Sequence, residues 1–442
     1  MTPPSDRVHA GPLLLPPVLL AATLFLLSAD LLFVSVAGLK IKCGYFLILA
    51  MWLFAPTAMY ETAKAALSRV PPYAWLPLLP LAVAVATSVN PRGSVAWTLW
   101  LAFDLFTVTT VYAFLRVHAF SGDQVRTCIT WSLALISACA LLQFVAIYGF
   151  HRLLFEPQSH FDVYRINGIS GWPHFLNIFS FLLLPMVLIQ RKLRWHTAVV
   201  LAVLMFMLVQ STAKTGWVLF VVLGGLMLLL DRRVFMRSYL WFLLPVTIAA
   251  VMIPTPPYLR DAPSLSGSEK ITKFSADLNL ANKTTSGTDR VLITQMGLAI
   301  WWKHPWFGVG PRAYDDYVFT RFDQEMTGMN KLDANLTINA KNENIWVELL
   351  AENGALFTLA VAFVLCRALW VRRWAFANRL HLGAWMALVL YFGVSGQFSQ
   401  TGLLTMAYAV FGICFYAREL TRSSQLKSNA ATLVPADSVA AR

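Results

Sequence analysis

Long hydrophobic runs alternate with short polar breaks along most of the chain. A run of about 18 or more apolar residues is long enough to cross the roughly 30 Å of hydrocarbon in a membrane. The repetition of such runs predicts an all-α integral membrane protein with about twelve transmembrane helices. The predicted spans are 12–36, 43–60, 73–89, 95–115, 127–150, 173–190, 197–213, 216–230, 238–253, 345–366, 382–397 and 401–417.

One connection is far longer than the others. The pattern divides the chain into nine spans in 1–253, a large loop at 254–344, three spans in 345–417 and a disordered tail at 418–442. Within the loop, "TDRVLITQMGLAIWWKHP" carries apolar residues at helical spacing, which predicts an amphipathic helix at the membrane interface. Long loops are uncommon unless they are functional, so the loop is a candidate for the working part of the molecule.

Composition and charge support this interpretation. Hydrophobic residues make up 58% of the chain and charged residues only 13%, against about 25% in a soluble domain. The net charge of +13 does not indicate a nucleic-acid partner, because Lys and Arg occur in short clusters between spans. The five cysteines form no CxxC pair and imply neither a disulfide framework nor a metal site. The first apolar run reads as a retained helix rather than a cleaved signal peptide.

The distribution of Lys and Arg predicts the orientation. Clusters such as "RKLRWH" at 191–196 and "DRRVFMR" at 231–237 lie in alternate connections, which should therefore be cytoplasmic. The opposite connections, including 151–172 and the large loop, should face outward. With an even number of spans, both termini are expected in the cytoplasm.

Four basic residues fall on the predicted outer face: Arg165, Lys214, Arg290 and Arg312. Lys214 lies in the turn "STAKTGW" beside several hydroxyl groups, an arrangement suited to a lipid-linked phosphate. The alternative is a lysine that only sets helix depth at the interface.

Arg290 and Arg312 bracket the amphipathic stretch, and a guanidinium group matches pyrophosphate oxygens in two-point contact. Their alternative role is a solvated loop charge paired with Asp289 or Asp315. The glycines of "GVGPR" lack the full phosphate-loop pattern, so they do not predict a nucleotide site.

Acidic residues gather where the large loop enters the next span, in "KNENIWVELLAENG". Helical spacing places Asn344, Glu348 and Glu352 on one stripe, with Glu343 on the adjoining turn. Glu343 could be a favourable charge at a helix start. Glu348 and Glu352 fall deeper in the predicted span, where carboxylates need partners and usually mark a substrate path.

Histidine adds less to the prediction. His304 in "WWKHPW" and His174 in "WPHF" lie on the predicted outer face, but each is isolated. No His or Cys set has metal-ligand spacing, so the sequence predicts no metal site.

Four of these stretches together resemble the family of O-antigen ligases and O-antigen or exopolysaccharide polymerases. The resemblance covers roughly 160–366 and rests on "YRINGISGWPHF", "QSTAKTGW", "SGTDRVLITQMGLAIWWKHPWFGVGPRAY" and "NENIWVELLAENG". Two positions depart from the family pattern. Lys214 stands where the family usually has arginine, and Glu343 stands where it often has a histidine assigned as catalytic. A carboxylate can still act as general base toward a sugar hydroxyl.

The resemblance implies a GT-C-like, metal-independent, inverting glycosyltransferase without cofactors in the bacterial inner membrane. Its active site would face the periplasm and move glycan from an undecaprenyl-pyrophosphate-linked donor to an acceptor glycan hydroxyl. The implied catalytic residue is Glu343, with Asn344, Glu348 and His304 near the acceptor. The pyrophosphate would be bound by Lys214, Arg290, Arg312 and Arg165.

The glutamate at the histidine position favours a repeat-unit polymerase, for which a chain-length regulator is a candidate partner. A ligase that transfers glycan to lipid A–core is the main alternative. A transporter or flippase for lipid-linked glycans is the more distant one, and it would predict two related halves, which the sequence lacks.

Overall fold

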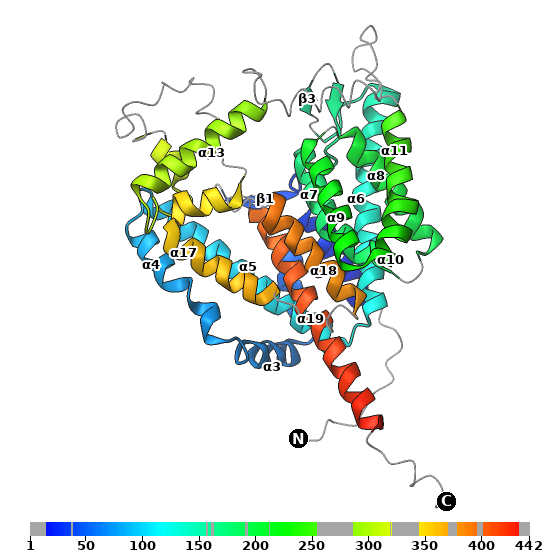
Figure 1. The fold of residues 1–442 in the computed structure, drawn as a ribbon, viewed down its shortest axis with the longest axis horizontal. Helices are drawn as coiled ribbons and strands as arrows, with labels where there is room; N and C mark the ends of the chain where they lie inside the picture. The colour runs from blue at the N-terminus through cyan, green and yellow to red at the C-terminus, as the bar shows by residue number, and fades with distance from the viewer. Residues whose placement is uncertain are drawn as a thin grey trace, which may run out of the picture.

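The structure is a computed structural model that describes residues 15–36, 39–155, 158–160, 163–190, 193–211, 213–253, 286–318, 320, 344–369, 378–395 and 401–432. It is a bundle of apolar helices whose long axes run between two ends (Figure 1). One end carries the helix α13 (Ser286–Lys303), and the other is where α19 (Thr401–Thr432) finishes. These are called the α13 end and the α19 end below.

The described elements up to residue 150 are six α-helices, two short 3-10 helices and one hairpin. In chain order they are α1 (Leu15–Leu27), β1 (Phe33–Val36), β2 (Leu39–Lys42), α2 (Cys43–Ala50), the 3-10 helix η1 (Met51–Phe54), α3 (Pro56–Leu67), the 3-10 helix η2 (Pro72–Trp75), α4 (Leu78–Ala86), α5 (Pro91–Val117) and α6 (Gly122–Phe150).

The remaining described elements begin with a second hairpin. They are β3 (Gln158–His160), β4 (Val163–Arg165), α7 (Pro173–Leu188), α8 (Trp195–Gln210), α9 (Lys214–Leu230), α10 (Arg232–Val234), the π-helix η3 (Phe235–Leu243), α11 (Leu244–Met252), α13, α14 (Tyr314–Tyr317), α17 (Ile345–Leu369), α18 (Arg379–Leu390), the π-helix η6 (Tyr391–Ser395) and α19.

Helix α7 is the centre of the bundle. Every one of its residues except His174 is buried, as expected for a helix that is apolar on all sides. It packs against α18, α6, α9 and α19, and α19 in turn packs along α5. Gly383 of α18 permits the close approach to α7, because a Cβ there would lie 2.5 Å from Cα of Met186.

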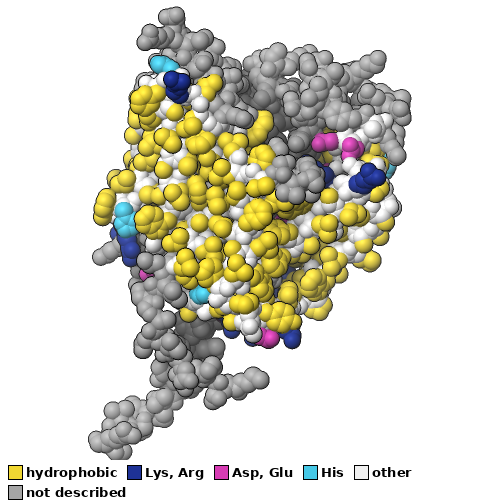
Figure 2. Space-filling model, turned by 180° about the vertical axis from the view of Figure 1, so that it is seen from behind, with side chains coloured by type: hydrophobic (Ala, Val, Ile, Leu, Met, Phe, Trp, Pro, Cys, Tyr) yellow, Lys and Arg dark blue, Asp and Glu magenta, His cyan; other side chains and the backbone are white. Residues whose placement is uncertain are grey.

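The apolar helices agree with a membrane protein. Among the described residues, five helices are long and apolar enough to cross a membrane, or six if the bent pair Cys43–Leu53 and Pro56–Leu67 counts as one span. Six shorter apolar helices overlap the other predicted spans, so each of the twelve predicted stretches contains a helix. Figure 2 shows a broad hydrophobic surface with charged side chains near its margins. The number of crossings stays a prediction.

Several predicted spans differ from the structure. The run 12–36 contains a helix that ends at Leu27, and the antiparallel hairpin β1–β2 follows it. The run 43–60 bends by 103° before Pro56, because a proline restricts the residue before it and Ala55 leaves the helical region. With the hairpin β3–β4, the described chain has two small sheets, so the all-α prediction missed these segments.

Two more differences concern the C-terminal third. The predicted span 345–366 is interrupted at Gly354, which has non-helical backbone angles. The half of α17 before Gly354 lies across the α13 end, and the half after it runs toward the α19 end (Figure 1). Helix α19 continues to Thr432, so this part of the expected disordered tail is helical. Its sequence, "RELTRSSQLKSNAAT", contains several good helix formers.

The predicted orientation can be tested with single cysteines in a variant that lacks the five native ones. Lys303→Cys at the α13 end should react with a membrane-impermeant maleimide in intact spheroplasts, because this end is predicted to face outward. Arg233→Cys, between α9 and α11, should react only after lysis. Both side chains are exposed in the structure. The reverse labelling pattern would contradict the orientation.

Candidate functional site

A closely packed junction joins the middle of the large loop to α17. The segment "HPWFGVGPRA", from His304 to Ala313, follows α13 and lies against the break in α17. The backbone N–H of Val309 donates to the carbonyl of Ala351 at 3.0 Å, and that of Gly310 donates to the carbonyl of Glu352 at 2.8 Å. The N–H of Ala355 donates back to Pro305 at 2.8 Å. The loop therefore supplies partners for backbone groups that the interrupted helix leaves open.

Three glycines make the junction possible. Gly308, Gly310 and Gly354 have φ angles of +67°, +108° and +73°, a region that other residues rarely adopt. A Cβ at Gly354 would lie 2.2 Å from the carbonyl oxygen of Trp306, and one at Gly308 would lie 2.3 Å from the backbone of Glu352. The glycines of "GVGPR" thus serve backbone packing rather than nucleotide binding.

The carboxylate of Glu352 lies inside this junction and is only 3% exposed. Its Oε2 accepts the backbone N–H of Arg312 at 2.9 Å, and its Oε1 accepts that of Tyr314 at 3.4 Å. These hydrogen bonds from backbone N–H groups compensate the buried carboxyl group for the water it has lost. The partner predicted for this deep acid is therefore the loop backbone, and the acid has a structural role.

The connection between α4 and α5 holds the other side of the same turn. The Ser94 hydroxyl donates to the carbonyl of Pro311 at 2.6 Å, and the N–H of Val89 donates to the carbonyl of Val309 at 3.0 Å. The side-chain amide of Asn90 donates to the carboxylate of Asp316. Sequence-distant segments therefore fix the backbone on both sides of Arg312.

The side chains around the junction include two of the predicted site residues. His304 contacts the buried Tyr317, with 3.3 Å between its Nε2 and the phenol oxygen. Glu348 is 3% exposed. Burial raises the pKa of Tyr314, and the negative charges of Asp315, Glu352 and Glu348 raise it further. Tyr314 is therefore a neutral phenol, and its hydroxyl donates to the carbonyl of Ile293 in α13 at 3.3 Å.

Asn344 caps the start of α17. Its Oδ1 accepts the backbone N–H groups of Trp346 at 3.0 Å and Val347 at 3.4 Å. The indole N–H of Trp346 donates to the carbonyl of Phe392 in η6 at 2.9 Å, and η6 packs on α7 and α9. The start of α17 is thereby tied to the same part of the bundle as the start of α9. Glu343, which precedes this cap, lies outside the described residues.

The turn between α8 and α9 forms a second polar group at the α13 end. The side-chain amide of Asn177 in α7 donates to the Ser211 hydroxyl at 2.9 Å. A Cβ at Gly216 would lie 2.1 Å from Oδ1 of Asn177, so only glycine permits this approach of α9 to α7. Lys214 is the first residue of α9, but its side chain lies outside the described part of the structure.

The loop before α7 carries Arg165, which is half-buried. Gln143 of α6 holds the loop, because its Oε1 accepts the N–H groups of Asn167 at 2.9 Å and Gly168 at 2.8 Å. The side chain of Asn167 then donates to the carbonyl of Gly171 at 2.8 Å. Arg165 therefore stands beside a loop fixed to the bundle.

The structure thus sorts the predicted site residues into groups. Arg312, Glu348 and His304 belong to the junction, whereas Lys214 and Arg165 belong to the α7–α9 side of the same end. Arg290 lies in α13, but its side chain is not among those described. The two groups are connected by Trp346, which follows the Asn344 cap and donates its indole N–H to η6, and η6 packs on α7 and α9.

The sequence reasoning missed a buried charge network beside these groups. Lys42 of β2 forms an ion pair with Asp30 and lies 5.9 Å from the ring centre of Phe179 in α7. Asp104 of α5 is 1% exposed and accepts the hydroxyl hydrogen of Thr405 at 2.5 Å. Burial lowers the pKa of Lys42, and the charge of Asp104 opposes that shift.

Charged groups buried among membrane helices usually mark substrate paths, so Lys42 and Asp104 are further candidates. The sequence did contain one sign of this site, since Asp104 is an acidic residue inside the predicted span 95–115. Lys42 lies just before the predicted span 43–60, and the hydrophobic pattern does not distinguish it from other basic residues in the connections.

Comparison with known proteins supports the resemblance found in the sequence. Residues 197–356 match the family model described as O-antigen ligase. This range contains the start of α9, helix α13, the junction and the first half of α17. No curated protein gives a significant match. The match supports membership of the O-antigen ligase and polymerase family, and with it a membrane-bound glycosyltransferase-type enzyme.

The junction predicts a specific effect on stability. Gly354→Ala should lower the free energy of unfolding by about 1–3 kcal/mol, because its backbone conformation is essentially restricted to glycine. The measurement is the melting temperature of the purified protein in detergent. Gly225→Ala in α9 is the matched control, since a Cβ there meets nothing within 4 Å. An equal melting temperature for both variants would show that the junction does not constrain α17.

Proposed function

We propose that this chain, as a member of the O-antigen ligase and polymerase family, transfers glycan from an undecaprenyl-pyrophosphate-linked donor to an acceptor glycan hydroxyl at the periplasmic face of the inner membrane. The proposed activity is repeat-unit polymerisation. The observation that carries the proposal is the family match over 197–356, which spans the elements that bring basic and acidic residues to the α13 end.

The arrangement of these elements supports a site at that end. Helix α9 begins there with Lys214, and the turn carrying Arg312 is fixed there by the Glu352 carboxylate. The first half of α17 lies across the same end, so Glu343 precedes a capped helix start that faces the middle of the bundle (Figure 1). A donor pyrophosphate and an acceptor hydroxyl could therefore meet between α17 and α9.

In the proposed reaction, the acceptor hydroxyl oxygen attacks the anomeric carbon of the donor sugar. The bond between that carbon and the pyrophosphate oxygen breaks, a glycosidic bond forms with inversion, and undecaprenyl pyrophosphate leaves. Glu343 accepts the proton of the hydroxyl as general base. Lys214, Arg290, Arg312 and Arg165 neutralise the charge that develops on the leaving pyrophosphate, and no metal or cofactor is assigned a step.

The other predicted residues have supporting roles in this proposal. Asn344 caps the helix start that follows Glu343, Glu348 is buried in that helix, and His304 packs on Tyr317. Trp302 and Trp306 have side chains 81% and 62% exposed. Tryptophan prefers the headgroup region of a membrane, so these residues are suited to a site for a lipid-linked substrate.

Ligation of glycan to lipid A–core is the second candidate, and the printed family description favours it. The two reactions share the donor and differ in the acceptor. Purified protein supplied with a lipid-linked oligosaccharide alone should produce longer lipid-linked glycans if it is a polymerase. A ligase would form no glycan product until lipid A–core is added. A transporter would form none with the lipid-linked oligosaccharide alone or with lipid A–core present.

The general-base assignment predicts a graded effect at one position. Glu343→Gln keeps the shape of the side chain but cannot accept a proton, so the transfer rate should fall by about 10²–10⁴-fold. Binding of the lipid-linked donor should persist, because other residues contact the phosphates. Glu343→His should recover more activity than the glutamine variant. A glutamine variant with the wild-type rate would remove Glu343 from the mechanism.

The phosphate assignment predicts that Lys214→Ala reduces transfer by about tenfold or more, because a cation that stabilises the leaving group is lost. Lys214→Arg should retain part of the activity. Lys303→Ala is the matched control, an exposed lysine of α13 at the same end of the molecule. Full activity in the Lys214→Ala variant, measured from product length on gels, would instead favour a lysine that only sets helix depth.

A further inference from the structure

A large groove opens at the α19 end, on the opposite side of the bundle from the proposed transfer site. It has a volume of about 1260 Å³ and lies between α6, α8 and α18, with Gln190, just after the end of α7, and part of α19 completing its wall. None of its lining residues belongs to the junction or to the α8–α9 turn. The proposed glycan transfer therefore gives this groove no task.

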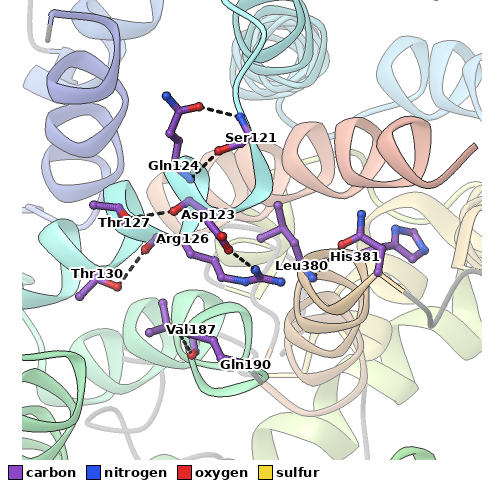
Figure 3. Close-up of polar contacts among 11 residues, drawn as sticks. Ser121, Asp123, Gln124, Arg126, Thr127, Thr130, Val187, Gln190, Leu380 and His381 are labelled. Atoms are coloured by element: carbon purple, nitrogen blue, oxygen red, sulfur yellow. Dashed lines mark hydrogen bonds and ion pairs between the residues drawn. The ribbon is translucent and has the colours of Figure 1, made fainter. Parts of the chain in front are cut away.

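Three helices begin at the groove. Helix α6 starts at a capping box in which Ser121 and Gln124 exchange hydrogen bonds, shown in Figure 3. Helix α18 starts at Asn378, whose Oδ1 accepts the N–H of Leu380 at 3.0 Å, and α8 starts after Arg194. The positive ends of three helix dipoles thus face one space and favour an anion there.

The side chains add a stronger positive charge. Arg126, Arg194 and Arg379 line the groove, and Asp123 is the one acidic residue in its described lining. Arg126 contacts Asp123 with 2.8 Å between Nη1 and Oδ1, as seen in Figure 3. One carboxylate against three guanidinium groups leaves two unbalanced positive charges, counted over these lining residues.

Arg126 is held in an unfavourable setting. Its side chain is 16% exposed, and its Nε is buried without a hydrogen-bond partner among the described residues. The positive charge of Arg379 repels the charged guanidinium group of Arg126. A guanidinium group that is repelled by a neighbouring cation and keeps an N–H without an acceptor is stabilised when an anion with several oxygens enters.

The rest of the lining indicates that the ligand is also apolar. Trp131, Ala134 and Val200 extend the groove along α6 and α8 away from the arginines. The side chain of Trp131 is 63% exposed, and Trp195 beside the groove is 79% exposed. Tryptophan at such a position is typical of the membrane–water boundary. The groove therefore combines a site for an anionic group with an apolar track at membrane depth.

We propose that this groove binds an anionic phospholipid, whose phosphate lies among Arg126, Arg194 and Arg379 and whose acyl chain follows Trp131 and Val200. Basic pockets between membrane helices are suited to such headgroups. The site does not rest on the proposed transferase activity, since it uses different residues at the other end of the bundle.

Native mass spectrometry of the full-length protein in detergent tests this, with phosphatidylglycerol and phosphatidylcholine added in equal amounts. The wild-type protein should retain phosphatidylglycerol in preference. Arg126→Gln combined with Arg379→Gln should weaken retention about twentyfold. Each cation near a headgroup raises the affinity for an anionic lipid roughly fivefold, and the double variant lacks two of them. Arg232→Gln combined with Arg233→Gln, two exposed arginines of α10, is the matched control and should behave like wild type.

Two further variants keep the test valid if the double variant fails to fold. Arg194→Gln changes an exposed side chain and should weaken retention about fivefold. Asp123→Asn removes the competing carboxylate, which is 78% exposed, and should strengthen retention. A purely structural role for the ion pair does not predict such a gain.

Three results would overturn the proposal. One is equal retention of both lipids, and another is unchanged phosphatidylglycerol retention in the arginine variants. The third is arginine-dependent binding of inorganic phosphate in calorimetry without arginine-dependent lipid retention, which would indicate a soluble phosphate compound as the ligand.

Discussion

The working end of this molecule depends on one buried carboxylate bonded to backbone. A carboxyl group removed from water is stable only where other donors replace its hydration, and Glu352 obtains them from the backbone N–H groups of Arg312 and Tyr314. These bonds attach the middle of the large loop to α17 at the point where that helix is interrupted. The position of Arg312, the direction of α17 and the place of its capped start at Asn344 all follow from this attachment.

The attachment also requires close backbone packing. Glycine permits such packing here and at another helix contact in the bundle. Gly308, Gly310 and Gly354 allow the loop to approach α17, as Gly216 allows α9 to approach Asn177. Hydrophobic burial does not favour helix contact within a membrane, so close packing of small residues and buried hydrogen bonds supply the association. This explains why the polar groups at the α13 end lie where helices approach most closely.

The sequence predicted the apolar helices well, because hydrophobic length is a local property. It missed the interruption at Gly354, since "WVELLAENGALF" consists mainly of residues compatible with one helix. The break is stabilised by contacts from Pro305 to Gly310, more than forty positions earlier, which no local pattern reveals. The pairing of Lys42 with Asp30 depends likewise on a hairpin that hydrophobicity alone did not predict.

The geometry separates the acids that the sequence had grouped on one stripe. Both oxygens of Glu352 already accept backbone N–H groups, so they are engaged in holding the junction together and are poorly placed to accept a substrate proton. Glu348 is also buried, with 3% of the residue exposed. Asn344, at the start of the stripe, is exposed, so an acid next to it can meet both water and substrate. The two buried acids are thus part of the packed junction, which supports the proposal that the general base is Glu343, the acid that precedes it in the sequence.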